Sequence, residues 1–571
     1  MDNRSIAKTF AQMADLLEIK GENAFKIRAY RSAGEVLWNW PDPLATLDER
    51  QLREIPGIGK DLAARIRELC DTGTCTYLQE LLTEFPASLL DLLKLQGIGP
   101  KTVVVLRDTL GVTSVEDLAA AARAGKVRGV KGMGAKKEAL ILKAIEERAK
   151  DAGRHLLSHT ATLARELVGY LTERHQDVEF IPVGSLRRGA ETCGDIDILA
   201  VGGSQGLMDT FTQHPQVERV LGHGDTKSSV RMAGFQIDLR LVAAESRGAA
   251  MQYFTGSKAH NVSLRDRAIR LGYTLNEYGL ARKADNEIVA GSDEEGIYRA
   301  LGLPWIAPEL REDRGEFSAA DAGLPRLVER RDIRGDLHMH TTATDGRDTL
   351  EAMAAAAHAR GYEYIAITDH SQALAMANGL DERRALAHAA AVRSLNGRFE
   401  GLTLLAGIEC DILEDGTLDL SEDCLAQLDI VIASVHSRFG QDESQMTDRL
   451  LKAMESPSVD ILAHPTGRHL FKRDPVQMHF DRIVGAAAAT GVALEINGQA
   501  HRLDLNDVLA RAARERGATI VLSTDAHSTG ELDQNLEWGL LTARRAWLEP
   551  AALLNTRPLD DLRAGLRRHR R

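Results

Sequence analysis

The sequence predicts a multidomain protein with a helical N-terminal third, an α+β middle section and a C-terminal distorted (β/α)7 barrel. Its 571 residues are too many for one hydrophobic core and suggest three to five domains. A glycine-rich turn recurs three times before residue 150, and apolar and polar residues alternate in the middle section. In the C-terminal part, seven short apolar runs each end in a polar residue, which is typical of a barrel with its site at the carboxyl ends of the strands.

The composition is that of a soluble globular protein with reduced thiols. Hydrophobic residues make up 44% and charged residues 27%, and no apolar run is long enough to cross a bilayer. The first residues lack the apolar segment of a secretory signal, so we expect a cytoplasmic protein without a membrane partner. The five cysteines are an odd number without a C-x-x-C motif, which favours thiols over disulfides or zinc ribbons.

The net charge of −12 is unevenly distributed. Residues 1–150 contain 23 Lys and Arg against 21 Asp and Glu, residues 151–333 contain 22 against 27, and residues 334–571 contain 26 against 35. The net charge of the three segments is therefore +2, −5 and −9, so the negative charge is concentrated at the C-terminal end. A non-specific polyanion binder would be more basic, so any DNA contact must come from local patches and backbone amides.

The N-terminal third contains three related turns, at residues 55–60, 95–101 and 130–137, each with two glycines followed by lysine. These turns predict helix-hairpin-helix elements, in which the free N–H groups and the positive dipole at a helix start bind phosphodiester oxygens. One such turn would more often be a plain helix connection, but three copies favour binding of the DNA backbone. The predicted contacts are Gly57, Gly59, Lys60, Gly97, Gly99, Lys101, Gly132 and Gly134.

The middle section is organised around residues 183–200, V-G-S-L-R-R-G-A-E-T-C-G-D-I-D-I-L-A. Asp195 and Asp197 stand two apart in an apolar strand, so both carboxylates leave the same face and suit Mg²⁺ or Mn²⁺. Just before them, the G-S-x-R-R turn at residues 184–188 offers a hydroxyl and two guanidinium groups, from Arg187 and Arg188, to phosphate oxygens. A phosphate cradle beside paired carboxylates indicates nucleotidyl transfer.

A third carboxylate, Asp238, lies on the polar face of a second predicted strand, residues 235–242. Three carboxylates can hold two metal ions, one that lowers the pKa of an attacking 3′-hydroxyl and one that bridges the triphosphate. A solvated acidic rim would explain any one of these residues. The combination with the phosphate turn favours a catalytic site.

With these motifs the sequence resembles the family X DNA polymerases, and the match continues through Y-F-T-G-S at 253–257 and G-Y-T-L-N-E-Y-G-L at 272–280. The resemblance implies a nucleotidyltransferase palm and a thumb, with Asp195, Asp197 and Asp238 as catalytic metal ligands. It also implies template contact by Arg265 and nucleotide contacts by Ser185, Arg188, Gly194, Tyr253, Phe254, Gly256 and Asn261. An aromatic side chain beside a glycine leaves room for deoxyribose and crowds a 2′-hydroxyl.

In this family the first helical segment can carry a 5′-deoxyribose phosphate lyase that uses a lysine. Aligned on P-G-I-G, the expected position is Arg65. A guanidinium stays protonated and cannot act as the amine nucleophile, so this activity is not expected from Arg65. Lys60 is the alternative nucleophile, against a simple phosphate contact or a solvated side chain.

The C-terminal part carries metal-ligand chemistry at the ends of its seven apolar runs. Six of the twelve histidines after residue 333 lie at these positions, together with three carboxylates. The nine potential ligands are His338, His340, His370, His436, His464, His527, Asp345, Glu409 and Asp525. One histidine at a strand end is usually a polar cap, whereas six indicate a site for up to three ions, with Mn²⁺ or Zn²⁺ favoured by imidazole.

This pattern resembles the PHP (polymerase and histidinol phosphatase) domain, a trinuclear phosphoesterase. The resemblance implies one metal held by His338, His340, Glu409 and Asp525, a second held by Glu409, His436 and His464, and a third held by Asp345, His370 and His527. Two arginines after His464, Arg468 and Arg473, are interpreted either as a clamp for the DNA phosphate or as surface residues.

Together these resemblances identify the chain as a bacterial or archaeal family X DNA polymerase with a PHP domain. The implied function is template-directed filling of short gaps in DNA repair, especially base excision repair, with 3′–5′ exonuclease, 3′-phosphatase or abasic endonuclease activity in the barrel. The implied partners are gapped or primer–template DNA and dNTPs, with other repair proteins as further candidates, and we expect a monomer. The expected domains are 1–88 (helical, DNA-binding), 89–150 (helix-hairpin-helix), 151–251 (palm), 252–316 (thumb-like), 317–333 (linker) and 334–571 (PHP).

Two alternatives remain open at this point. In one, the chain is a PHP-type phosphoesterase or abasic endonuclease whose N-terminal half binds DNA without polymerising; the presence of Tyr253, Asn261 and Arg265 argues against it. In the other, the chain is a scaffold that recruits repair proteins; the intact ligands at both sites argue against that.

Overall fold

The protein is described by a computed structural model that covers the chain except residues 2, 39, 41–42, 87, 93–97, 136, 140, 143–144, 146–152, 204 and 567–571. For residues 4, 35, 38, 91, 100, 101 and 116 it describes the backbone alone. The chain divides into two compact units, Met1–Arg154 and His155–Arg571. Every helix among the described residues is too short or too polar to span a lipid bilayer.

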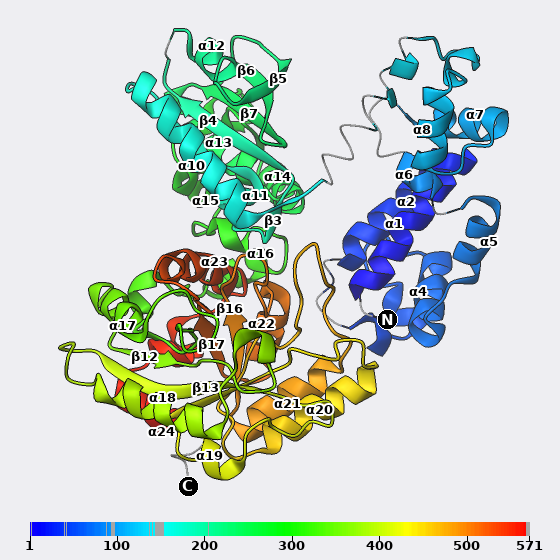
Figure 1. Ribbon diagram of the computed structural model, residues 1–571. Helices are drawn as coiled ribbons and strands as arrows, with labels where there is room; N and C mark the ends of the chain where they lie inside the picture. Colours follow the sequence, from blue (N-terminus) through cyan, green and yellow to red (C-terminus); the bar gives the residue numbers. More distant parts are fainter. Residues whose placement is uncertain are drawn as a thin grey trace. The chain divides into compact units, whose positions relative to one another are not determined.

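The described residues of the first unit form helices and turns (Figure 1). Ile6, Phe10, Met13 and Leu17 of the first helix recur at helical spacing and are fully buried, so one face of this helix supplies the centre of the unit's core. The helices are α1 (Asn3–Lys20), α2 (Ala24–Trp38), α3 (Glu49–Leu52), α4 (Lys60–Thr72), α5 (Thr76–Glu84), α6 (Leu89–Leu92), α7 (Pro100–Leu110) and α8 (Val115–Arg123).

The second unit begins with a five-stranded sheet of order β2-β4-β7-β6-β5, in which only β4 and β7 are parallel neighbours. Its strands are β2 (Glu179–Pro182), β4 (Asp195–Val201), β5 (Val217–Gly222), β6 (Lys227–Met232) and β7 (Phe235–Val242); β1 (His155–Leu156) pairs separately with β3 (Thr192–Cys193). Its helices are α10 (Leu157–Arg174), α11 (Gly184–Arg187) and α12 (Leu207–Thr212).

The two faces of this sheet have different roles. Ile196 and Ile198 of β4 and Ile237 of β7 point into a core shared with α10 and α12. The intervening residues of β4 point to the other face, where Leu199 packs against Ala250 of α13 (Arg247–Thr255). The period of two therefore puts every polar residue of these strands on the side covered by α13.

After α13, a small α+β segment follows, whose core includes Leu264, Leu280 and Ile297. It contains α14 (Lys258–Arg270), the antiparallel strands β8 (Tyr273–Asn276), β9 (Gly279–Arg282) and β10 (Ile288–Ala290), α15 (Glu294–Ala300) and α16 (Glu316–Ala322).

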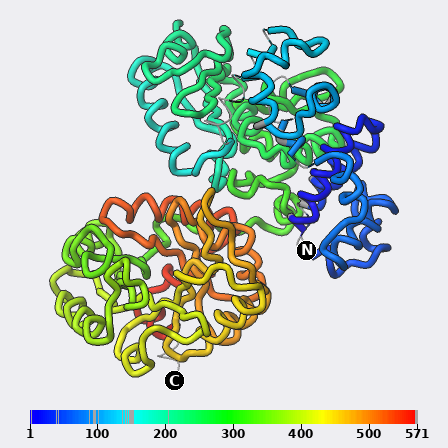
Figure 2. The backbone as a smooth tube through the Cα atoms, turned by 45° about the vertical axis from the view of Figure 1, so that its right-hand side comes forward, coloured from blue at the N-terminus to red at the C-terminus, as the bar shows by residue number. Residues whose placement is uncertain are grey.

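Residues from 335 onward form seven parallel strands in the order of the sequence, as predicted. Figure 1 draws strands of this part as arrows among its helices, and Figure 2 traces its backbone from green to red. The strands are β11 (Gly335–Asp336), β12 (Tyr364–Ile367), β13 (Thr403–Asp411), β14 (Ile430–Ser434), β15 (Ile461–Leu462), β16 (Ala493–Asn497) and β17 (Ile520–Ser523). The helices are α17 (Leu350–Ala359), α18 (Glu382–Ser394), α19 (Glu422–Leu425), α20 (Glu443–Glu455), α21 (Phe480–Thr490), α22 (Asp507–Glu515), α23 (Glu531–Arg545) and α24 (Leu559–Gly565).

Alternate strand residues fill the inside and the outside of this barrel. Tyr364 and Ala366 of β12 belong to the interior cluster, whereas Ile365 and Ile367 pack against the surrounding helices. Short contacts beyond the strand ends, such as the bridge between Met339 and Ala526, bring the first and last strands together. Because all strands are parallel, their carboxyl ends and the polar residues that follow them meet on one face.

Candidate functional site

The three predicted carboxylates of the first site converge. Asp197 of β4 and Asp238 of β7 are direct partners across the parallel ladder, and Asp195 is two residues before Asp197 on the same face. Asp195 is exposed, Asp197 is partly buried and Asp238 is buried, so the group is open to solvent at one end only. Among the described residues, these three carboxylates do not form one of the groups whose ligand atoms all lie within 4.8 Å of one another, so a divalent cation would have to draw together carboxylates that otherwise repel each other.

The electrostatics of this group reflect that repulsion. Burial, followed by the negative charges of Asp195 and Asp238, raises the pKa of Asp197 to about 6. The pKa of Asp238 is shifted in the opposite direction. Burial alone would raise it, but hydrogen bonds from Lys227, Ser229 and Gln236, together with the charge of Lys227, whose Nζ lies 2.7 Å from Oδ2, lower it below its ordinary value. The amide of Gln236 also donates to Asp238, at 3.2 Å. Sequence reasoning missed Lys227. Buried and more exposed residues alternate along β6, and this pattern could have placed Lys227 on the more exposed face of the strand.

The raised pKa of Asp197 makes a prediction for the metal-free protein. A folded-state pKa near 6, above the unfolded value near 4, means that ionised Asp197 opposes folding above pH 6 and not below pH 4, on the order of 2 kcal/mol. In EDTA we expect Asp197→Asn to melt at a higher temperature than the wild type at pH 8, with a smaller difference at pH 5. A difference that does not change with pH would contradict this account.

The phosphate turn lies directly beside the carboxylates. Gly184 has φ +67°, and a Cβ at this position would lie 3.1 Å from Oδ2 of Asp197, so the close approach requires glycine. Ser185 follows on the short helix α11, and Gly194 precedes β4. The turn therefore carries its hydroxyl next to the metal-binding face.

The two arginines of this turn do not behave alike. Arg187 forms a two-pronged ion pair with buried Glu294, at 2.7 and 2.9 Å, and donates to Thr255, so its guanidinium is held by the protein rather than presented to a phosphate in this structure. Arg188 donates to the backbone oxygen of Thr255 at 2.5 Å and to Glu312 at 3.1 Å. Only Arg188 remains a candidate phosphate contact.

The predicted nucleotide contacts of α13 and α14 gather around Gly256. Gly256 has φ +63°, and a Cβ there would lie 3.5 Å from Nη1 of Arg188 and 3.9 Å from Nδ2 of Asn261. The rings of Tyr253 and Phe254 meet edge to face at 5.0 Å. Asn261 donates to the backbone oxygen of Tyr253, which orients its amide. Arg265, one turn further along α14, donates to the backbone oxygen of Asn261.

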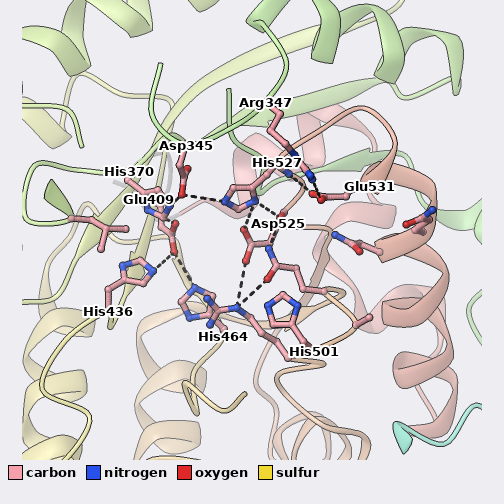
Figure 3. A pocket seen from close by; sticks show the side chains of 16 residues that line it. Asp345, Arg347, His370, Glu409, His436, His464, His501, Asp525, His527 and Glu531 are labelled. Atoms are coloured by element: carbon pink, nitrogen blue, oxygen red, sulfur yellow. Dashed lines mark hydrogen bonds and ion pairs between the residues drawn. The ribbon is translucent and has the colours of Figure 1, made fainter. Parts of the chain in front are cut away.

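The nine predicted ligands of the barrel also converge at the carboxyl ends of the strands. Seven of them line a pocket of about 600 Å³ (Figure 3), whereas His338 and His340 are fully buried beside it. Glu409 is at the centre: its Oε1 lies 3.0 Å from His464 and 3.4 Å from His436, and its Oε2 lies 2.9 Å from His370. The remaining contacts join Asp525 to His340 at 3.1 Å and to His338 at 3.7 Å, and Asp345 to His370 at 3.4 Å and to His527 at 3.5 Å.

Three groups of these side chains place their ligand atoms close enough to share an ion. They are His340, Asp345, His370 and His527; His338, His340 and Asp525; and His370, Glu409 and His436. His340 and His370 each belong to two groups, so they lie between the sites that the family resemblance had separated. His464 joins the group around Glu409 through its 3.0 Å contact.

The chemistry of this cluster fits metal ions. Within the described chain, Nε2 of His338 and both ring nitrogens of His340 are buried without a hydrogen-bond partner, a costly state that coordination would relieve. Burial, together with the neighbouring His370 and His527, lowers the pKa of His340 to about 4, so this ring is the neutral form that binds metal. For His370 the carboxylates of Glu409 and Asp345 outweigh burial and raise the pKa to about 10, which indicates a proton where a cation would bind.

A second layer of carboxylates orients these imidazoles. Nδ1 of His338 lies 2.7 Å from Glu495, and Nδ1 of His436 lies 3.1 Å from Asp411. Asn497 donates both to Glu495 and to Asp525. Such partners fix the tautomer of a ligating histidine. Sequence reasoning missed Glu495 and Asp411, although each stands two residues from a predicted polar strand residue and therefore on the same face.

The two arginines predicted near His464 are engaged elsewhere. Arg468 is 5% exposed and binds the backbone oxygens of Arg502 and Leu503 and the carboxylate of Glu191, so it is neither a clamp nor a surface residue. The guanidinium of Arg473 stacks on Phe439 at 3.7 Å and donates to the backbone. The pocket is instead lined by two arginines that the sequence did not single out, Arg347 and Arg502.

In the first unit, two of the three glycine-rich turns can be compared directly. Gly57 and Gly132 both have φ +83°, and Gly59 and Gly134 stand two residues later, all exposed, with open space around each. In both turns the residue between the two glycines is apolar and buried, which anchors the turn to the core. Lys60 is the first residue of α4, and its side chain is exposed. In the remaining turn, at residues 95–101, Gly99 is the N-cap residue of α7. Gly97 lies outside the described residues, as does the side chain of Lys101.

At the lyase position, the guanidinium of Arg65 stacks on the ring of Tyr77 at 3.9 Å. The ring of Tyr30 lies 6.0 Å from the same guanidinium and 6.1 Å from the ring of Tyr77. Arg65 is thus part of an aromatic packing arrangement.

Models of known families match five segments of the chain. They are a helix-hairpin-helix domain at residues 1–75, a SAM-like helix-hairpin-helix tandem at 89–147, the DNA polymerase beta palm at 158–227, the DNA polymerase beta thumb at 250–312 and a PHP domain at 336–499.

Individual relatives match either the whole chain or the barrel. A Bacillus subtilis (strain 168) protein described as DNA polymerase/3′-5′ exonuclease PolX is 38% identical over 573 residues, and the match covers 100% of both chains. A probable phosphatase of Shewanella sp. (strain MR-4) is 34% identical over 214 residues, which cover 35% of this chain and 80% of the relative. A probable phosphatase of Thermoanaerobacter sp. (strain X514) is 29% identical over 232 residues, which cover 39% and 89%.

Proposed function

The chain belongs to the family X DNA polymerases that carry a C-terminal PHP domain, and on this premise we propose that it both extends and trims DNA 3′ ends. Its palm adds nucleotides to fill short gaps during repair, and its PHP barrel hydrolyses phosphodiesters in the 3′–5′ direction. The observations that carry the proposal are the three carboxylates that share one face of β4 and β7, Asp195, Asp197 and Asp238, and the nine candidate ligands that meet in the barrel of the same chain.

In the palm, we assign metal binding to the three carboxylates and phosphate binding to Ser185, Gly194 and Arg188. Mg²⁺ or Mn²⁺ at this position supplies a lowered pKa for the primer 3′-hydroxyl and charge neutralisation for the triphosphate. The chain's own part is to position the nucleotide. We assign contact with the sugar to Gly256, Tyr253 and Phe254, contact with the base edge to Asn261 and contact with the template to Arg265; the rings of Tyr253 and Phe254 lie beside Gly256 in sequence and meet edge to face.

In the barrel, we assign up to three Mn²⁺ or Zn²⁺ ions to the nine ligands, with Glu495 and Asp411 orienting His338 and His436. Such ions supply a hydroxide nucleophile and bind the non-bridging phosphate oxygens. Exonuclease action is favoured by the full-length relative, and the resemblance of the barrel to probable phosphatases supports 3′-phosphatase action as a second candidate.

DNA binding is assigned to the exposed glycine turns, whose helix N-termini bind phosphates without base readout. The proposed domains are those expected from the sequence, with boundaries after residues 88, 150, 251, 316 and 333. We propose a monomer that binds gapped or primer–template DNA and dNTPs and that works alongside other repair proteins.

One experiment tests both activities. A labelled primer in a one-nucleotide gap is incubated with the full-length protein and Mg²⁺ or Mn²⁺, with and without dNTPs, after metal analysis of the purified protein. We expect extension with dNTPs and stepwise shortening without them. Protein that shortens the primer and never extends it would support the phosphoesterase alternative instead.

Within the barrel pocket, Arg502 is the best-placed phosphate contact. Its side chain is 18% exposed, and its Nε lies 3.2 Å from Gln499 and 4.0 Å from Oδ2 of Asp525, beside the predicted ions. We expect Arg502→Met to reduce the rate of exonuclease digestion by roughly 10- to 100-fold, because a charge-assisted phosphate contact is lost, while primer extension is unchanged.

The matched control is Arg516→Met, which removes an arginine from the same domain that pairs with Asp481 on the surface. Both variants are assayed on the same 3′-labelled strand. Normal digestion by Arg502→Met would show that the phosphate is bound elsewhere.

A further inference from the structure

The PHP helix α23 supports the phosphate turn of the palm. Leu541 of α23 approaches Gly189 so closely that a Cβ on the glycine would lie 3.0 Å from it. Trp538 of the same helix shares a buried apolar cluster with Cys193, just before the catalytic strand β4. Since both domains belong to one compact unit, the turn that carries Ser185 and Arg188 rests on the barrel.

The last residue of α23, Arg545, also contacts this turn, through a buried guanidinium. The side chain of Arg545 is 8% exposed, and its Nη1 donates to the backbone oxygen of Arg188 at 2.9 Å and to Oε1 of Glu312 at 2.8 Å. Its Nη2 lies 2.9 Å from Asp507, which also binds Arg314 at 2.8 Å. Arg545 therefore contacts the main chain of Arg188 and the carboxylate that pairs with the Arg188 side chain.

These contacts link five side chains whose charges alternate between positive and negative. In order they are Arg188, Glu312, Arg545, Asp507 and Arg314. Burial raises the pKa of Glu312, but Arg545 and Arg188 outweigh burial and keep the pKa below its ordinary value, so Glu312 is ionised. Three cations against two anions leave one positive charge, and Arg188 is the cation at the nucleotide end.

Glu312 and a triphosphate compete for the same guanidinium. Without a second cation, an ionised and largely buried Glu312 would bind Arg188 strongly, because breaking that pair would leave a buried charge uncompensated. Arg545 removes this penalty, since Glu312 keeps a partner when Arg188 turns to a phosphate.

We propose that Arg545, a residue of the PHP domain, is a positioning residue of the polymerase site that holds Arg188 available for the triphosphate of the incoming nucleotide. This inference rests on the proposed function, in which the palm incorporates dNTPs. The PHP barrel then has a role in nucleotide binding that is separate from its own hydrolytic site.

The test is single-nucleotide incorporation into gapped DNA by the full-length protein, with KM for the dNTP and kcat measured separately. Arg545→Met is expected to raise KM about tenfold or more, as for the loss of one charged interaction, with a much smaller change in kcat. Adding Glu312→Gln to this variant removes the competing carboxylate and is expected to bring KM back toward the wild-type value. A purely structural defect would not be reversed by a second substitution.

The matched control is Arg544→Met, because Arg544 is the preceding residue of α23 but pairs with Glu309 and the backbone of Val328. It is expected to leave KM unchanged, and the exonuclease rate reports on the fold of every variant. If Arg545→Met does not fold, Arg545→Lys, which keeps the charge, is expected to stay within about threefold of the wild-type KM.

Two results would overturn the inference: an unchanged KM in folded Arg545→Met, or a KM raised about tenfold or more in Arg545→Lys. These outcomes differ from failure of the proposed function, in which the wild-type protein would incorporate no nucleotide.

Discussion

Asp195→Ala is expected to lower nucleotide addition by at least about a thousandfold while exonuclease digestion continues at the wild-type rate. Asp195 is the exposed member of three carboxylates that face one another on β4 and β7, so its loss removes a ligand at the open end of the group. The barrel cluster contains none of these residues, and its chemistry should be unaffected. Primer extension and digestion of the same labelled substrate measure the two rates.

The control for this change is Asp209→Ala, which removes a carboxylate from the same domain. Asp209 is exposed, pairs with His223 and belongs to α12, which covers the face of the sheet opposite to the three carboxylates. It is expected to extend primers normally. If Asp195→Ala also extends them normally, the assignment of the first site is wrong.

The reverse result is expected for His338→Ala. His338 is fully buried, faces Glu409 and Asp525 through Nε2, and is held by Glu495 through Nδ1, so alanine removes a ligand and leaves Glu495 without its partner. We expect digestion to fall by at least about a hundredfold, with fewer ions bound per chain by metal analysis, and primer extension to be retained.

His358→Ala is the matched change, because His358 lies on the surface of α17 and contacts only the backbone oxygen of Glu400 among the described hydrogen bonds. It should keep both activities and the full metal content. Undiminished digestion by His338→Ala would mean that the barrel cluster is not the hydrolytic site.

The positions of the candidate ligands at both sites were predictable because the relevant signals are local. Asp195, Asp197 and Asp238 stand in strands whose alternation assigns each side chain to a face, and the ladder between β4 and β7 confirmed that all three share it. In the barrel, each ligand follows an apolar run, and parallel strands bring their ends to one face. Family resemblance supplied the functional roles, and the full-length similarity confirmed the family.

The arginines were not predictable in the same way. Arg187 and Arg188 are neighbours in one turn, yet the first is bound by Glu294, 107 residues away, and the second is shared with Glu312. Arg468 looked like a phosphate ligand by its position after His464, but it binds Glu191 of the palm. A long cationic side chain takes whichever carboxylate the packing of distant elements brings near it.

By itself, the sequence determined the domain order, the fold class and the groups that can bind metals, because strand periodicity and motif spacing act over a few residues. Only the tertiary structure decided which arginine side chains are candidates for binding phosphate and which are held in buried ion pairs. It also decided that the phosphate turn rests on α23 through Arg545. Those outcomes depend on contacts between segments hundreds of residues apart, and their free energy is set by burial and charge pairing, which no local pattern records.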